Sequence, residues 1–168
     1  DIMPLTPTRV QRIAPKALYF DGIDDYVSIP DFIIEPGNEI TIEALVMPIS
    51  FDDFRGIVSK YIDASNRIAV AFGSDKKVRF GWNIGNAGWD VIQSDPLTEY
   101  AWYLIDATAK IRTMKLYVNS SLVANGEHKF VDFNWNAFTT DIWVGKYVIP
   151  YPCHHGYFAL VRKYNRAL

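Results

Sequence analysis

The sequence predicts an all-β domain in which two antiparallel sheets pack face to face as a sandwich. Short runs rich in β-branched and aromatic residues recur about every 8 to 12 residues, and each run ends at Gly, Asn, Asp, Ser or Pro. No segment shows the 3.6-residue period of an amphipathic helix, so parallel strands joined by helical crossovers are not expected. With 168 residues and no internal repeat, the chain is expected to form one hydrophobic core.

The chain is expected to begin with an extended arm, residues 1–16, because Pro4, Pro7 and Pro15 interrupt a stretch without a strand or helix period. Residues 17–168 are expected to form the sandwich. Alternation of apolar and polar residues is clearest over residues 40–47 and 78–84. Further strands are predicted over residues 56–61, 67–72, 89–94, 101–109, 114–118, 121–124, 140–144 and 157–164.

Three turns are predicted between these strands. Residues 84–88 contain two glycines and join two aromatic strands, which should bring Trp82 close to Trp89 across a hairpin. Asn119-Ser120 should form a second tight hairpin, and Asn125-Gly126 is a third turn signal because both residues tolerate a positive φ.

Residues 17–30, which read ALYFDGIDDYVSIP, resemble the opening of the laminin G-like domains of the concanavalin A-like lectin/glucanase superfamily. Four further segments resemble the family in the expected order. They are Thr-Ile-Glu-Ala at residues 41–44, Trp102, Tyr-Val-Asn at residues 117–119, and the closing segment 156–168. The resemblance implies a jelly-roll fold and an extracellular or surface-exposed location. The chain departs from the family pattern at Leu45, at Ser120 and at Ala159-Leu160, where Trp, Gly and an acidic pair are usual.

Composition excludes several classes of function. The net charge is -2 and no basic cluster is longer than Lys76-Lys77, so the charge footprint of a nucleic-acid-binding protein is missing. No apolar run approaches the ~20 residues that span a membrane, so no membrane span is expected. Cys153 is the only cysteine and cannot form an internal disulfide.

Catalysis is not expected. Glycosidases on this fold pair two carboxylates on one strand face with an Asp between them, but Glu39 and Glu43 flank Thr41 instead. The three residues Cys153-His154-His155 are potential zinc ligands, yet neighbours on an extended backbone point to opposite sides and no second pair completes a tetrahedral set.

A metal site is predicted at the turn Asp21-Gly22-Ile23-Asp24-Asp25. Asp21, Asp24 and Asp25 put three carboxylates within five residues at a bend of the backbone. Ca²⁺ prefers several hard oxygen ligands from carboxylates and main-chain carbonyls, and calcium sites recur in the superfamily that the sequence resembles. The alternative is an ordinary Asp-Gly turn without a cation.

Ligand-binding residues are predicted in two aromatic and amide-rich segments. Sugar rings stack on Trp and Tyr, while short amides and acids bind the hydroxyl groups. The residues expected to bind are Asn86, Trp89 and Asp90 in one segment and Asn134, Trp135 and Asn136 in the other. Trp82, Trp102 and Trp143 alternate with polar neighbours and are expected in the core instead.

Two functions follow from these observations. The first is a non-catalytic carbohydrate-binding module for recognition or adhesion, with a glycan as its partner. The alternative is a structural or assembly subunit of a virion, fibre or cell-surface layer, in which residues 1–16 contact another subunit and produce a homo-oligomer.

Overall fold

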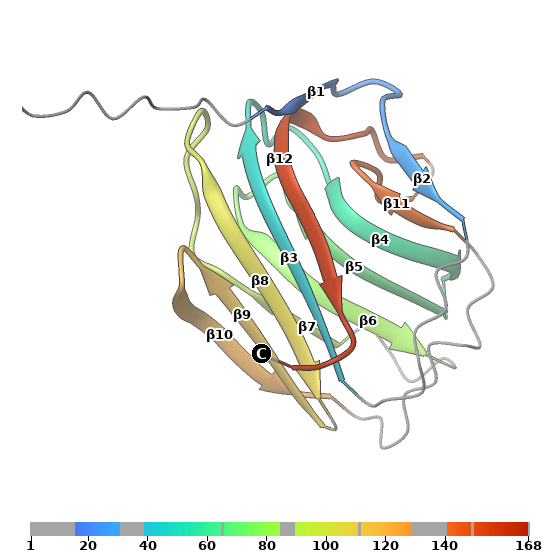
Figure 1. Cartoon of the computed structure of the whole chain (residues 1–168), viewed down its shortest axis with the longest axis vertical. Coiled ribbons are helices and arrows are strands. Elements are labelled where there is room, and N and C mark those ends of the chain that lie inside the picture. Colours follow the sequence, from blue (N-terminus) through green and yellow to red (C-terminus); the bar gives the residue numbers. More distant parts are fainter. Residues whose placement is uncertain are drawn as a thin grey trace, which may run out of the picture.

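The computed structural model describes residues 16–30, 39–64, 66–84, 90–110, 112–128, 141–148 and 150–167 (Figure 1). In these ranges the chain forms twelve strands and no helix. Accordingly, no described segment is a helix of the length and hydropathy needed to cross a membrane. Of the arm expected over residues 1–16, only Lys16 belongs to the described part.

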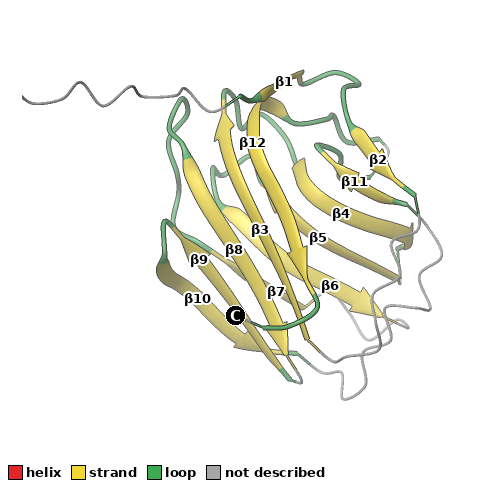
Figure 2. Ribbon diagram, in the orientation of Figure 1, coloured by secondary structure: helices red, strands yellow, loops and turns green. Residues whose placement is uncertain are grey.

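The strands form two six-stranded sheets that face each other, as Figure 2 shows. The first sheet has the order β1-β12-β3-β8-β9-β10 and the second has the order β2-β11-β4-β5-β6-β7. All strand pairs are antiparallel, so the predicted two-sheet jelly-roll sandwich is confirmed. The strand bounds are β1 Leu18–Asp21, β2 Val27–Ile29, β3 Glu39–Pro48, β4 Arg55–Asp63, β5 Asn66–Phe72, β6 Val78–Ile84, β7 Asp90–Gln93, β8 Tyr103–Lys110, β9 Thr113–Val118, β10 Ser121–Glu127, β11 Ile142–Val144 and β12 His155–Tyr164.

The core lies between the sheets and follows from the period of 2 in the strands. In β3, Ile40, Ile42, Ala44 and Val46 all point inward and are almost fully buried. The largest fully buried side chains are those of Trp82, Phe72 and Phe80, all in the opposite sheet. Each buried apolar side chain of this size contributes roughly 1.5–3 kcal/mol to stability.

Of the three tryptophans expected in the core, only Trp82 lies there. Trp102 is 38% exposed, because it precedes β8 and the first inward position of that strand belongs to Tyr103. Trp143 is half-buried, because its neighbour Val144 takes the inward position of β11 and turns the indole toward the other face. The prediction was therefore wrong for Trp102 and Trp143.

The Asn119-Ser120 hairpin is confirmed between β9 and β10, with positive φ values of 51° and 66° at its two central residues. The turn predicted at Asn125-Gly126 is wrong, since both residues lie within β10. A Cβ on Gly126 would stand 2.7 Å from Cγ2 of Ile92, so this glycine permits a close approach of β7 rather than a turn.

Candidate functional site

The acidic turn, residues 21–25, is the point where the chain leaves one sheet for the other. Two strands flank this turn: β1 pairs with β12 of the first sheet, and β2 pairs with β11 of the second. Gly22 has a φ of +84°, which a residue with a Cβ rarely adopts. A Cβ there would also stand 2.7 Å from Cβ of His155. The glycine therefore allows the turn to lie directly against the start of β12.

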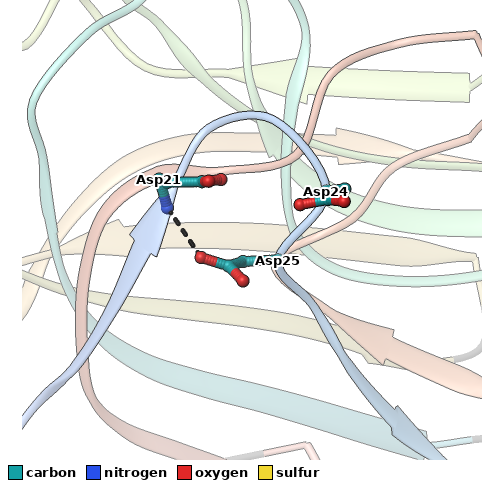
Figure 3. A group of neighbouring side chains, drawn as sticks. All are labelled: Asp21, Asp24 and Asp25. Carbon is teal, nitrogen blue, oxygen red and sulfur yellow. Dashed lines mark hydrogen bonds between the residues drawn. The ribbon is translucent and has the colours of Figure 1, made fainter.

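Hydrogen bonds within the acidic turn hold two of its carboxylates. The amide of Ile23 donates to Oδ1 of Asp21 at 2.8 Å. The amide of Asp21 donates to Oδ2 of Asp25 at 3.0 Å, as Figure 3 shows. Each bond uses one oxygen of a carboxylate that has two. The side chains of Asp24 and Asp25 are exposed, and that of Asp21 is half-buried.

The carboxylates of the acidic turn are close enough together to share one cation. Asp21, Asp24 and Asp25 each offer one carboxylate oxygen, and these three oxygens lie within 4.8 Å of one another. Two ligands at 2.3–2.6 Å from one Ca²⁺ are separated by at most about 5 Å. The structure thus brings together all three residues that the sequence predicts for a metal site. Their hard oxygens suit Ca²⁺, whose remaining ligands would be main-chain carbonyls and water.

Arg55 supports the acidic turn from inside the protein. Its side chain is almost fully buried and donates to the carbonyl oxygens of Gly22, at 3.1 Å, and Cys153. Its Nε also donates to Oδ1 of Asp52 at 2.7 Å. Burial alone would raise the pKa of Asp52, but the hydrogen bond and charge of Arg55, with a hydrogen bond from Ser50, lower it below its usual value. Arg55 thereby fixes the acidic turn to two other loops.

An aromatic cluster of Tyr26, Trp143 and Lys146 lies beside the acidic turn. Tyr26 is 44% exposed, and its ring centroid lies 6.4 Å from that of Trp143 in an edge-on arrangement. The Lys146 ammonium stands 4.0 Å from the Tyr26 ring centroid and 4.7 Å from that of Trp143, within the range of a cation–π contact. Gly145, the residue before Lys146, lies against the end of the acidic turn: a Cβ on it would stand 3.5 Å from the carbonyl oxygen of Asp25. The aromatic cluster and the acidic turn are therefore adjacent.

Backbone register explains why the aromatic cluster forms. Val144, the last residue of β11, pairs with Val27, the first residue of β2. Because the strands are antiparallel, Tyr26 before β2 and Gly145 after β11 lie at the same end of the pair. The sequence prediction missed the cluster because it placed Trp143 in the core. The available signal was Tyr26, an aromatic residue directly after the three predicted metal ligands.

A family model described as the concanavalin A-like lectin/glucanases superfamily matches residues 21–168. The chain belongs to this superfamily. The sequence prediction of the family is therefore confirmed. Among curated proteins, none matches the sequence.

Several solved structures of the same architecture are similar to this member of the superfamily. One is CBM40 of the Ruminococcus gnavus IT-sialidase bound to α2,3-sialyllactose, with 11% identity and a TM-score of 0.67 over 86% of this chain and 92% of that chain. Another is domain 4 of AbnA, a GH43 extracellular arabinanase from Geobacillus stearothermophilus, in complex with arabinotriose, with 16% identity and a TM-score of 0.73 over 90% and 71%. Domains LG4-5 of the mouse laminin α1 chain share 18% identity with a TM-score of 0.65 over 89% and 43%. At these identities the similarity establishes the fold.

The predicted sugar-binding residues are mostly outside the described part of the chain. Asp90 is described: it opens β7, is half-buried and lies opposite Trp82 of β6. The pairing of β6 with β7 confirms the predicted hairpin between them. The other five residues lie outside the described ranges and remain predictions: Asn86, Trp89, Asn134, Trp135 and Asn136.

The two carboxylates weighed for catalysis in this glucanase-containing superfamily make bonds that join strands. Glu39 accepts a hydrogen bond from the amide of Ala167 at 3.1 Å and pairs with Lys110 at 3.4 Å. Glu43 accepts from the hydroxyl of Tyr164 at 3.2 Å and pairs with Arg162 at 3.4 Å. Both glutamates thus tie β3 to neighbouring segments of the first sheet.

Proposed function

We propose that this domain is a non-catalytic carbohydrate-binding module that recognises a glycan at the edge formed by the acidic turn and the aromatic cluster. The observation that carries the proposal is the juxtaposition of three carboxylates with an exposed tyrosine and a half-buried tryptophan. Membership of a superfamily of lectins and glucanases supports it, as do similar folds whose structures contain sialyllactose and arabinotriose.

The two features supply complementary chemistry. A Ca²⁺ ion held by Asp21, Asp24 and Asp25 would coordinate sugar hydroxyls, which are hard oxygen ligands of the kind this cation prefers. The rings of Tyr26 and Trp143 present apolar surface on which the C–H face of a sugar stacks. The ligand would therefore be anchored through its hydroxyls and oriented by its apolar face.

The predicted residues Asn86, Trp89, Asp90, Asn134, Trp135 and Asn136 belong to the proposal as a second binding region. Their composition suits a sugar, because two tryptophans stand among amides and an acid. We further propose that the domain acts outside the cell or on a surface, where glycans are displayed.

A glycan array tests the proposal and separates the two regions. Asp24→Asn removes a charged cation ligand and should reduce glycan retention to background, whereas Tyr26→Ala should weaken binding about fivefold through loss of an aromatic contact of about 1 kcal/mol. Asp95→Asn, at an exposed site outside both features, is the matched control and should bind normally.

The variants Trp89→Ala and Trp135→Ala report on the second region. If these two variants lose glycan binding while Asp24→Asn and Tyr26→Ala retain it, the glycan binds at the second region and not at the acidic turn. Absence of any glycan binding by the unaltered protein, with Ca²⁺ present, would contradict the proposal as a whole.

The assembly function is retained as the second candidate because one specific observation favours it. Leu18, which opens β1, and Ile23, in the acidic turn, are 61% and 75% exposed, and large apolar side chains left exposed along one segment suit a contact with another subunit. If this edge, together with residues 1–16, contacts another subunit, Ile23→Asp should lower the solution mass measured by light scattering. Equal monomer masses for both proteins would contradict assembly through this edge.

A further inference from the structure

An apolar pocket of about 170 Å³ lies between the two sheets, away from the acidic turn. The described residues that line it include Ile42 of β3, Val58 of β4, Ile68 of β5, Ile142 of β11 and Val161 of β12. Its volume is similar to the ~150 Å³ of an engineered apolar cavity that stays dry and takes up benzene. The pocket is therefore large enough for a small hydrocarbon group.

The pocket adjoins an open groove of about 280 Å³ at the edge of the sandwich. Ile29, Val144 and Val161 line both spaces, so they mark the junction. The residues lining the rest of the groove include Phe158 of β12, Val27 of β2 and Leu18 of β1. An extended ligand could thus lie partly in the pocket and partly in the groove.

The apolar lining is interrupted by Ser59 and by three basic residues, Lys60, Arg162 and Lys163. Lys60 is 2% exposed, and Lys163 lines the same pocket from β12. Burial, together with the neighbouring charge of Lys60, lowers the pKa of Lys163 to about 8. Both lysines take part in further interactions within the protein, and an ammonium has three donors, so it can also serve an acceptor in the pocket.

The positive charge of the lining favours an anion in this position. The lysines are close enough for their positive charges to repel, and both are withdrawn from water by apolar neighbours. A negative group between them is attracted to both charges, and a low local dielectric strengthens that attraction. The apolar walls in turn require that the rest of the ligand be hydrocarbon.

We propose that the pocket binds a medium-chain fatty acid, with its carboxylate at Lys60 and Lys163 and its alkyl chain in the pocket and groove. No described residue that lines the pocket or the groove belongs to the acidic turn or to the aromatic cluster. The inference is therefore independent of carbohydrate binding, and either can fail without the other.

Calorimetric titration of the full chain with sodium octanoate tests the proposal. We expect saturable binding of one octanoate, and at least about tenfold weaker binding to Lys163→Met, because a charged hydrogen bond contributes about 1.5–3 kcal/mol. Lys115→Met, which removes an exposed lysine of β9 outside the pocket, should bind as tightly as the unaltered protein. Octanol, which has the same chain without the charge, should bind at least about tenfold more weakly than octanoate.

The position of the ligand is measured separately by methyl NMR shifts. Octanoate should move the signals of Ile142 and Val161 and leave those of Ile92, at the far edge of the second sheet, unchanged. Because Lys163→Met removes a buried charge, it should melt no lower than the unaltered protein, which distinguishes lost binding from lost folding. The proposal is overturned if the unaltered protein does not bind octanoate, if octanol binds equally well, or if the shifts lie elsewhere.

Discussion

His154 lies between the sheets with its ring packed against Phe20, Phe72 and Phe158, at centroid distances of 6.5, 5.8 and 4.6 Å. The side chain is fully buried, and neither ring nitrogen has a hydrogen-bond partner among the described residues. Burial, with smaller contributions from the nearby charges of Arg55 and His155, lowers its pKa from 6.5 to about 3. Folding therefore requires a neutral imidazole at this position.

This requirement predicts a pH-dependent stability. Between pH 6.5 and pH 3 the unfolded chain binds a proton at His154 and the folded protein does not, so the free energy of unfolding falls as the pH falls. The loss should reach about 2 kcal/mol between pH 8 and pH 5. Urea denaturation at these two pH values measures it.

The comparison protein for this measurement is His154→Leu, which keeps an apolar side chain in the same place. It should be at least as stable at pH 7, because a buried polar group without hydrogen-bond partners is removed. Between pH 8 and pH 5 its free energy of unfolding should fall by about 2 kcal/mol less than that of the unaltered protein. His128, whose pKa burial also lowers, is present in both proteins and cancels in the difference. Identical profiles for the two proteins would show that His154 is not the group that titrates.

At the scale of the element, the hairpin between β9 and β10 is held by backbone and side-chain bonds to β8. The amide of Asn119 donates to the carbonyl oxygen of Leu104 at 2.8 Å, and the amide of Leu104 donates to Oδ1 of Asn119 at 3.0 Å. Asparagine tolerates the positive φ that this turn requires, but Ser120 at +66° is strained. The family's usual glycine avoids that strain.

We expect Ser120→Gly to stabilise the protein by about 1 kcal/mol, because the left-handed region costs a residue with a Cβ roughly 1–2 kcal/mol, part of which is offset by the greater entropy of glycine in the unfolded chain. Thermal unfolding of the two proteins measures the difference. A melting temperature of Ser120→Gly below that of the unaltered protein would mean that the turn is not strained at this residue.

Strand prediction succeeded where local rules decide the structure. The alternation in residues 40–47 and 78–84 predicts β3 and β6 closely, because the side chains of one face must all be buried together. It failed where a tertiary contact decides: Gly126 reads as a turn residue, but its role is to make room for Ile92 on a distant strand. No local pattern carries that information.

The candidate site was predictable only in part for a similar reason. Asp21, Asp24 and Asp25 are neighbours in sequence, so their convergence follows from one turn. Tyr26, Trp143 and Lys146 meet through the pairing of β2 with β11, two strands separated by more than 100 residues of chain. Sequence periodicity placed Trp143 on the wrong side of β11 because it does not show which face of a short edge strand is buried.

At the scale of the whole molecule, the acidic turn links the two sheets, so a cation bound there should stabilise the entire sandwich. A Ca²⁺ concentration about 100 times the dissociation constant adds about 2.7 kcal/mol, which for a domain of this size corresponds to a melting-temperature increase of roughly 5–10 °C. Differential scanning calorimetry with Ca²⁺ and with a chelator measures this increase. Asp24→Asn should abolish it, and a melting curve of the unaltered protein indifferent to Ca²⁺ would remove Asp21, Asp24 and Asp25 as ligands.

We propose above that the sandwich presents a cation-dependent sugar site at the acidic turn. The most direct test measures retention of the 168-residue chain on a glycan array, first with Ca²⁺ and then after chelation on the same array. We expect retention on a defined set of glycans that is lost on chelation and restored when Ca²⁺ is returned. Retention unaffected by chelation, or no retention in either condition, would contradict it.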